Sequence, residues 1–213
     1  MGTNIEAEGD DEFPLRITRL LQSHPAIASV RLVGSRAEHR ATAVSDWDFA
    51  VDAPNFPSAA AVLPILVRPL APLGTFWDPL SQRQCFIAIL PGPRKVDFIF
   101  QERHRQEPPY VVGTETLAAM DVHFWDWILW LVAKESAGRS ELVTSELQKM
   151  HYFLTGPLGV PGVAPTLGAA VQNFLEAREQ AEMRFGCRVR RDLSNEVIRF
   201  LVSHGYTIEN RGG

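Results

Sequence analysis

The stretch Val30-Arg31-Leu32-Val33-Gly34-Ser35, followed by ten residues and then Asp46-Trp47-Asp48, decides the fold. The β-branched run 29–33 predicts a short strand, which Gly34 ends because glycine can turn the backbone and let a ligand approach closely. Ser35 then stands where a helix can begin, so its hydroxyl can cap the first turn or donate to a phosphate oxygen. The pattern predicts a phosphate-binding turn between a strand and a helix.

Two carboxylates follow this turn. Residues 46–51 alternate between polar and apolar, which is the periodicity of a strand, so Asp46 and Asp48 are expected on one face. Two carboxylates on one face repel each other unless a cation lies between them. Mg²⁺ prefers such oxygen ligands and brings substrate phosphates with it.

A third carboxylate lies in the apolar run Val96-Asp97-Phe98-Ile99-Phe100. An unpaired carboxylate on a strand built for burial is costly, so Asp97 needs a partner. A metal shared with Asp46 and Asp48 would supply one. Three such groups can hold two metal ions about 4 Å apart, an arrangement suited to in-line phosphoryl displacement.

The rest of the first half predicts a mixed α/β layer. Residues 84–90 and 95–100 are strand candidates, and Pro91-Gly92-Pro93 between them predicts an antiparallel hairpin. A first helix is expected to end near Ser23. A second is expected over 59–70, kinked or split at Pro64.

After Pro108-Pro109 the sequence predicts helices only. Phe124, Trp127, Ile128 and Leu131 form an apolar stripe on the first of them. The others are expected at 140–154, 166–183 and 193–204. We therefore predict an α+β protein: a mixed β-sheet with flanking helices over 1–108, followed by an all-helical bundle over 109–213.

The composition of the chain restricts the classes of ligand that we expect it to bind. The chain has 213 residues, a net charge of -4 and a pI near 5.9. It contains no large basic block, so we expect a small, locally held nucleotide and no nucleic-acid partner. Cys85 and Cys187 have no metal-like spacing, which predicts free thiols in a reducing cytoplasm.

The sequence also predicts a soluble, cytoplasmic protein with no membrane partner. The acidic segment 6–12 contains no apolar run and is not a secretory signal. The most membrane-like stretch, 122–133, is too short to span a bilayer and contains Asp126.

Gly34-Ser35, Asp46-x-Asp48 and a later Asp97 together resemble the signature of the DNA polymerase β-like nucleotidyltransferases over about residues 28–100. The resemblance implies that Asp46 and Asp48 bind two Mg²⁺ ions. It implies that Asp97 binds the catalytic one and helps to deprotonate the acceptor hydroxyl. Gly34 and Ser35 would hold the β- and γ-phosphates of a nucleoside triphosphate, and Arg36, the next residue, is a further candidate for phosphate.

The helical half looks like that of the aminoglycoside and lincosamide nucleotidyltransferases. The likeness lies in the aromatic segment 124–130, in Lys134 and in the turn 138–141 (Gly-Arg-Ser-Glu), which departs from the common Arg-Gly-Glu order. It implies that Lys134 reaches the triphosphate. Glu141 is our candidate for binding a cationic, hydroxyl-bearing small-molecule acceptor.

Alternatives stay open. The enzyme could nucleotidylate a protein or an RNA end, as antitoxin-type members do, or the chain could be a catalytically silent nucleotide-binding module. The tryptophans at 125, 127 and 130 are more typical of packing than of base stacking, and an exposed tryptophan helix would suit a homodimer contact.

Overall fold

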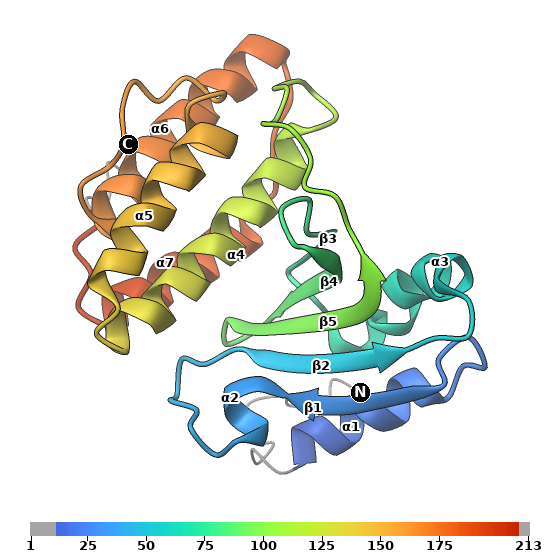
Figure 1. Ribbon diagram of the computed structural model, residues 1–213. Helices are drawn as coiled ribbons and strands as arrows, with labels where there is room; N and C mark the ends of the chain where they lie inside the picture. The colour runs from blue at the N-terminus through green and yellow to red at the C-terminus, as the bar shows by residue number, and fades with distance from the viewer. Residues whose placement is uncertain (1–11, 209–213) are drawn as a thin grey trace. The chain divides into compact units, whose positions relative to one another are not determined.

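The computed structural model describes residues 12–208 (Figure 1). The chain divides into two compact units between Gln106 and Glu107. Most of the acidic segment used above to exclude a secretory signal lies outside the described residues. Within residues 12–208, no helix combines the length and the apolar character needed to cross a membrane.

A five-stranded mixed sheet with the strand order β1-β2-β5-β4-β3 forms the first unit. Its strands are β1 (Ser29–Val33), β2 (Trp47–Asp52), β3 (Gly74–Trp77), β4 (Arg83–Leu90) and β5 (Arg94–Arg103). β2 and β5 are parallel, whereas every other neighbouring pair is antiparallel. The predicted hairpin of β4 and β5 is confirmed.

One face of this sheet packs against α1 (Glu12–Gln22) and α3 (Phe56–Leu66). Alternate residues of the strands point into this core, as the period of two requires. They include Trp47, Phe49 and Val51 of β2 and Val96, Phe98 and Phe100 of β5, all at most 3% exposed. The residues between them lie on the opposite face, and that face carries the candidate site.

One local expectation is corrected, and one strand was missed. Pro64 does not split its helix: α3 begins at Phe56, where the Asn55 side chain accepts a bond from Ser58 N–H, and it ends two residues after Pro64. A short 3₁₀ turn, Arg68–Leu70, follows. The edge strand β3 was not predicted, because four residues that begin with glycine carry almost no periodic signal.

The second unit contains α4 (Leu117–Ser136), α5 (Ser140–Met150), a π-helical turn (His151–Thr155), α6 (Leu167–Phe185) and α7 (Asp192–Ser203). No strand occurs in its described residues, 107–208. α4 contacts α5, α6 and α7, and it is buried on most of its sides. Phe124 stacks on Phe174 of α6 with ring centres 3.7 Å apart.

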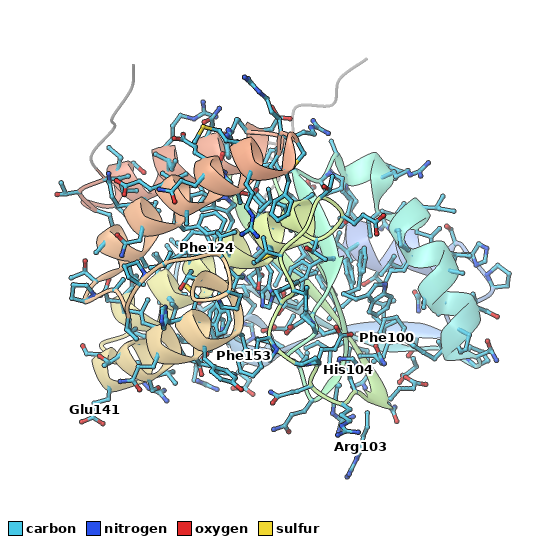
Figure 2. The ribbon with its side chains drawn as sticks, turned by 90° about the horizontal axis from the view of Figure 1, so that it is seen from above. Phe100, Arg103, His104, Phe124, Glu141 and Phe153 are labelled. Carbon is cyan, nitrogen blue, oxygen red and sulfur yellow. The ribbon has the colours of Figure 1, made fainter. Side chains whose placement is uncertain are left out.

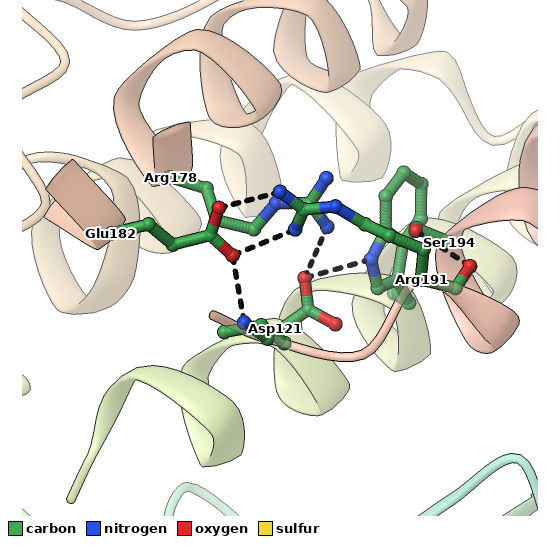
Figure 3. Close-up of polar contacts among 7 residues, drawn as sticks. Asp121, Arg178, Glu182, Arg191 and Ser194 are labelled. Carbon is green, nitrogen blue, oxygen red and sulfur yellow. Dashed lines mark hydrogen bonds and ion pairs between the residues drawn. The ribbon is translucent and has the colours of Figure 1, made fainter. Parts of the chain in front are cut away.

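A cluster of two ion pairs, one of them fully buried, joins these helices (Figure 3). Arg178 of α6 donates from Nη1 to Asp121 Oδ1 at 2.7 Å, and both side chains are at most 3% exposed. Arg191 binds Glu182 through two hydrogen bonds of 2.8 and 2.5 Å. We call these four residues the helical ion cluster. It contains two carboxylates and two guanidinium groups, so its charges balance.

Candidate nucleotide and metal site

Asp48 and Asp97 lie directly opposite each other on the central pair of strands. β2 and β5 are parallel, and the register pairs Asp48 with Asp97. Since Trp47 and Phe49 point into the core, Asp48 points to the other face, and the same alternation places Asp97 there. Asp46, immediately before β2, shares this parity. We call Asp46, Asp48 and Asp97 the carboxylate cluster.

The absence of a side chain at Gly34 leaves room for the Asp48 carboxylate. It follows β1, whose last residue, Val33, pairs with Asp48 across the antiparallel ladder. Its φ is +69°, a conformation that favours glycine, and a Cβ built there would overlap Asp48 Oδ2 and lie 3.2 Å from Cγ. The close approach predicted for a ligand is therefore made here by the Asp48 carboxylate.

The prediction that Ser35 caps a helix is wrong. The short helix α2 spans Gly34–Ala37, and its N-cap is Val33, with no side-chain cap bond. Ser35 is the second residue of this helix, so it lies inside the first turn. Contacts of Gly34 and Ser35 with phosphate stay predictions.

Arg36 holds the loop that leads into β2. Its Nε donates to the carbonyl oxygen of Asp46 at 3.1 Å, and Nη2 donates to that of Ser45 at 2.8 Å. Its guanidinium also lies 3.9 Å from the ring centre of Trp47, a cation–π contact. Arg36 therefore helps to fix the backbone of Asp46, while its predicted contact with a nucleotide stays a prediction.

Lys95 is the member of the site that the sequence reasoning missed. Its side chain is 5% exposed and forms an ion pair with Asp97, and its Nζ lies 3.9 Å from Asp46 Oδ2. The spacing Lys95-x-Asp97 could have revealed it, because i and i+2 on a strand share a face.

The donor chemistry of the carboxylate cluster fits Mg²⁺, which prefers carboxylate oxygens. As the side chains lie, however, no three His, Cys, Asp or Glu residues between 12 and 208 form a group that could hold a metal ion. The Lys95 ammonium pairs with Asp97 and lies 3.9 Å from Asp46 Oδ2. Mg²⁺ at this site is therefore a proposal, and Lys95 has to be accounted for in it.

The two predicted residues of the helical unit occupy different environments. Lys134, in the last turn of α4, lies over the ring of half-buried Trp130 with Nζ 4.9 Å from the ring centre. Glu141, in the first turn of α5, is exposed and projects away from its helix (Figure 2). Their contacts with triphosphate and acceptor stay predictions.

The tryptophans of α4 mainly serve packing. Trp125 is fully buried and Trp127 is 6% exposed, which confirms the packing interpretation for both. Trp127 Nε1 also donates to Glu146 at 3.1 Å. An exposed tryptophan face, on which the homodimer expectation rested, is reduced to the half-buried Trp130.

Comparison with known proteins assigns no family to the chain. No protein-family model matches it, and neither does any curated protein. Among solved structures, it is similar to the polymerase core of TRAMP, an RNA surveillance complex, with 13% sequence identity and a TM-score of 0.35. The alignment covers 100% of this chain, which spans 61% of that one. A likeness this distant establishes neither a family nor a function.

Proposed function

We propose that the protein transfers a nucleoside monophosphate from a nucleoside triphosphate to a hydroxyl group. The observation that carries the proposal is the register of Asp48 with Asp97 on parallel strands, with Gly34 packed against the Asp48 carboxylate. This arrangement places two carboxylates side by side at the end of a strand–turn–helix unit, and Asp46 lies on the same face. The sequence signature described above has these same elements.

In the proposed reaction, the acceptor oxygen bonds to the α-phosphorus while the bond from that phosphorus to the bridging oxygen of pyrophosphate breaks. Asp97 accepts the hydroxyl proton, and pyrophosphate leaves. Asp46 and Asp48 would hold Mg²⁺ together with Asp97. When bound, the metal would offset the negative charge that develops on the phosphate oxygens.

For the acceptor, we propose a small hydroxyl-bearing molecule of the aminoglycoside type. Support comes from the sequence of the helical half, with its aromatic α4, Lys134 and the exposed Glu141. A catalytically silent nucleotide-binding module is the second candidate. The observation that favours it is the ion pair of Lys95 with Asp97, which occupies the carboxylate that should act.

The test is incubation with each labelled nucleoside triphosphate and Mg²⁺, together with a panel of aminoglycosides and lincosamides. We expect label transfer to at least one compound, with release of pyrophosphate. Asp48→Asn should abolish transfer, whereas Asp52→Asn should not. Asp52 lies on the same strand and face but bonds to Ser29 and Gln101 instead. Nucleotide binding without pyrophosphate release for any acceptor would favour the silent module.

A further inference from the structure

We propose that one face of the helical unit binds a second copy of this chain in a two-fold symmetric pair. The face is formed by the second half of α6 and the connection from α6 to α7, with Met183 at its centre, and we call it the α6 face. The inference does not rest on the proposed function, because the α6 face contains none of the residues assigned to the reaction.

The α6 face has an exposed apolar side chain that borders two hollows. Met183 is 76% exposed. One hollow, of about 550 Å³, lies between α6 and α7, and half-buried Leu175 and Ile198 form apolar parts of its wall. The other, of about 510 Å³, lies beside the connection and includes Cys187. Because helices associate by placing the side chains of one into the grooves of another, the α6 face offers both parts that a pair of helices needs.

Two opposite charges lie on either side of Met183 along the chain. Glu179 precedes it by about one helical turn, and Arg188 follows it in the connection to α7. Both side chains are exposed and line the second hollow together with Met183, and neither forms an ion pair within residues 12–208. These two residues make the α6 face acidic on one side of Met183 and basic on the other.

This pattern of charge is complementary to itself. In a symmetric pair with the two-fold axis near Met183, the two α6 helices run antiparallel, so Glu179 of one copy faces Arg188 of the partner subunit. The symmetry repeats the same contact on the other side of the axis. Opposite charges brought together in this way steer association and fix the register of an interface. A second copy of the chain therefore matches both the apolar centre of the α6 face and its two charges.

Reversal of one charge at a time tests the proposal, with the association of the full chain measured by sedimentation equilibrium over a concentration series. The mass of the wild type should approach twice the 23.8 kDa of one chain as the concentration rises. Glu179→Arg and Arg188→Glu should each raise the dissociation constant by about tenfold or more, because like charges then face each other twice in the pair. An equimolar mixture of the two variants should associate as the wild type does, since both facing pairs again have opposite signs.

Glu115→Arg is the matched control. Glu115 is exposed, lies before α4 and forms no ion pair within the described part of the chain, so the same reversal should leave the dissociation constant unchanged. A wild type that stays monomeric at every concentration would overturn the proposal and leave the α6 face open to a different partner. Unchanged dissociation constants in Glu179→Arg and Arg188→Glu would place the dimer contact on another face. A mixture of the two that fails to associate would refute the facing charges.

Cross-linking covers the case in which a charge reversal prevents folding. Met183→Cys, combined with Cys187→Ser, puts a thiol near the proposed axis, while the remaining Cys85 is buried. We expect a short bismaleimide to join two copies of this variant. Val163→Cys with the same Cys187→Ser change is the control, because Val163 is exposed but lies before α6, and it should be joined far more slowly. Equal cross-linking of the two variants would contradict an axis near Met183.

Discussion

The protein contains two clusters of charge, one in each unit, and they differ in the kind of cation that pairs with their carboxylates. In the helical ion cluster, two guanidinium groups pair with two carboxylates, and Arg191 donates two hydrogen bonds to Glu182. In the sheet, the Lys95 ammonium pairs with Asp97, and its Nζ lies 3.9 Å from Asp46 Oδ2. The cations of the first cluster are planar guanidinium groups, whereas that of the second is a point charge on a flexible chain.

This difference separates a structural cluster from a candidate site better than burial does. In both clusters, a charge that is shielded from water depends on its partners. The helical ion cluster has two carboxylates and two guanidinium groups, so removing one member leaves a charge without its partner. The carboxylate cluster offers oxygen ligands, so a cation that binds it would offset the repulsion among them.

The largest expected effect is on activity. Asp48→Asn should lower turnover by about a thousandfold or more, because several kcal/mol of charge stabilisation at the phosphate would be lost. In the absence of metal, the same change should lower the free energy of unfolding by no more than about 1 kcal/mol, because asparagine keeps the size and shape of the aspartate side chain. Steady-state kinetics and urea denaturation in EDTA measure the two quantities. Strong destabilisation by Asp48→Asn would remove the contrast between the clusters.

In the helical ion cluster the expectation is reversed. Arg178→Met should destabilise the protein by about 3–5 kcal/mol, because it leaves the Asp121 carboxylate buried without its cation. Urea denaturation measures the loss. Arg184→Met, on the same helix but exposed, is the control and should cost less than about 0.5 kcal/mol. A cost below about 1 kcal/mol for Arg178→Met would mean that the pair is not structural.

Gly34→Ala probes how tightly Asp48 is placed. We expect a loss of about 1–3 kcal/mol of stability from the left-handed backbone, and a fall in activity because the new Cβ displaces the Asp48 carboxylate. Gly92→Ala is the matched control. Gly92 also has a positive φ, of 101°, but a Cβ there meets nothing within 4 Å. If both variants kept full activity, the packing of Gly34 against Asp48 would have no functional role.

The smallest expected effect is a pH dependence. Burial raises the pKa of Glu182, but hydrogen bonds from Arg191 and from the Val189 N–H outweigh burial and set that pKa below its ordinary value of 4.5. The pair therefore stabilises the fold above pH 4.5, and this contribution is lost as the pH falls through the lowered pKa. Arg191→Gln should be less stable than the wild type by about 1 kcal/mol near neutral pH. The difference should shrink in urea titrations below pH 4.5, and a constant difference would contradict the assignment.

The sequence predicted the elements whose periodicity is strong. Alternation identified β2 and the β4–β5 hairpin, and the same alternation placed Asp46 and Asp48 on one face. Placing Asp97 beside Asp48 additionally required the pairing of β2 with β5, which no local pattern contains. That expectation came from the resemblance of the sequence motif to a known family signature. The register of the two strands brings Asp48 and Asp97 together.

Other features could not be read from local patterns. Asp121 and Arg178 meet because α4 packs on α6, and nothing in the sequence near either residue indicates the other. The alternation of side chains along a strand could have placed Lys95 on the same face as Asp97. Lys95 was overlooked because a lysine next to an apolar run is usually solvated at its tip, and burial of its ammonium depends on carboxylates contributed partly by another strand.

The parallel pairing of β2 and β5 also has a consequence for folding. All of α3, β3 and β4 lie between these strands in the chain, so a long loop must close before Asp48 and Asp97 can meet. Parallel contacts of this kind form slowly compared with helices and hairpins. We therefore expect the two carboxylates to come together late, after the helices and hairpins with local contacts have formed.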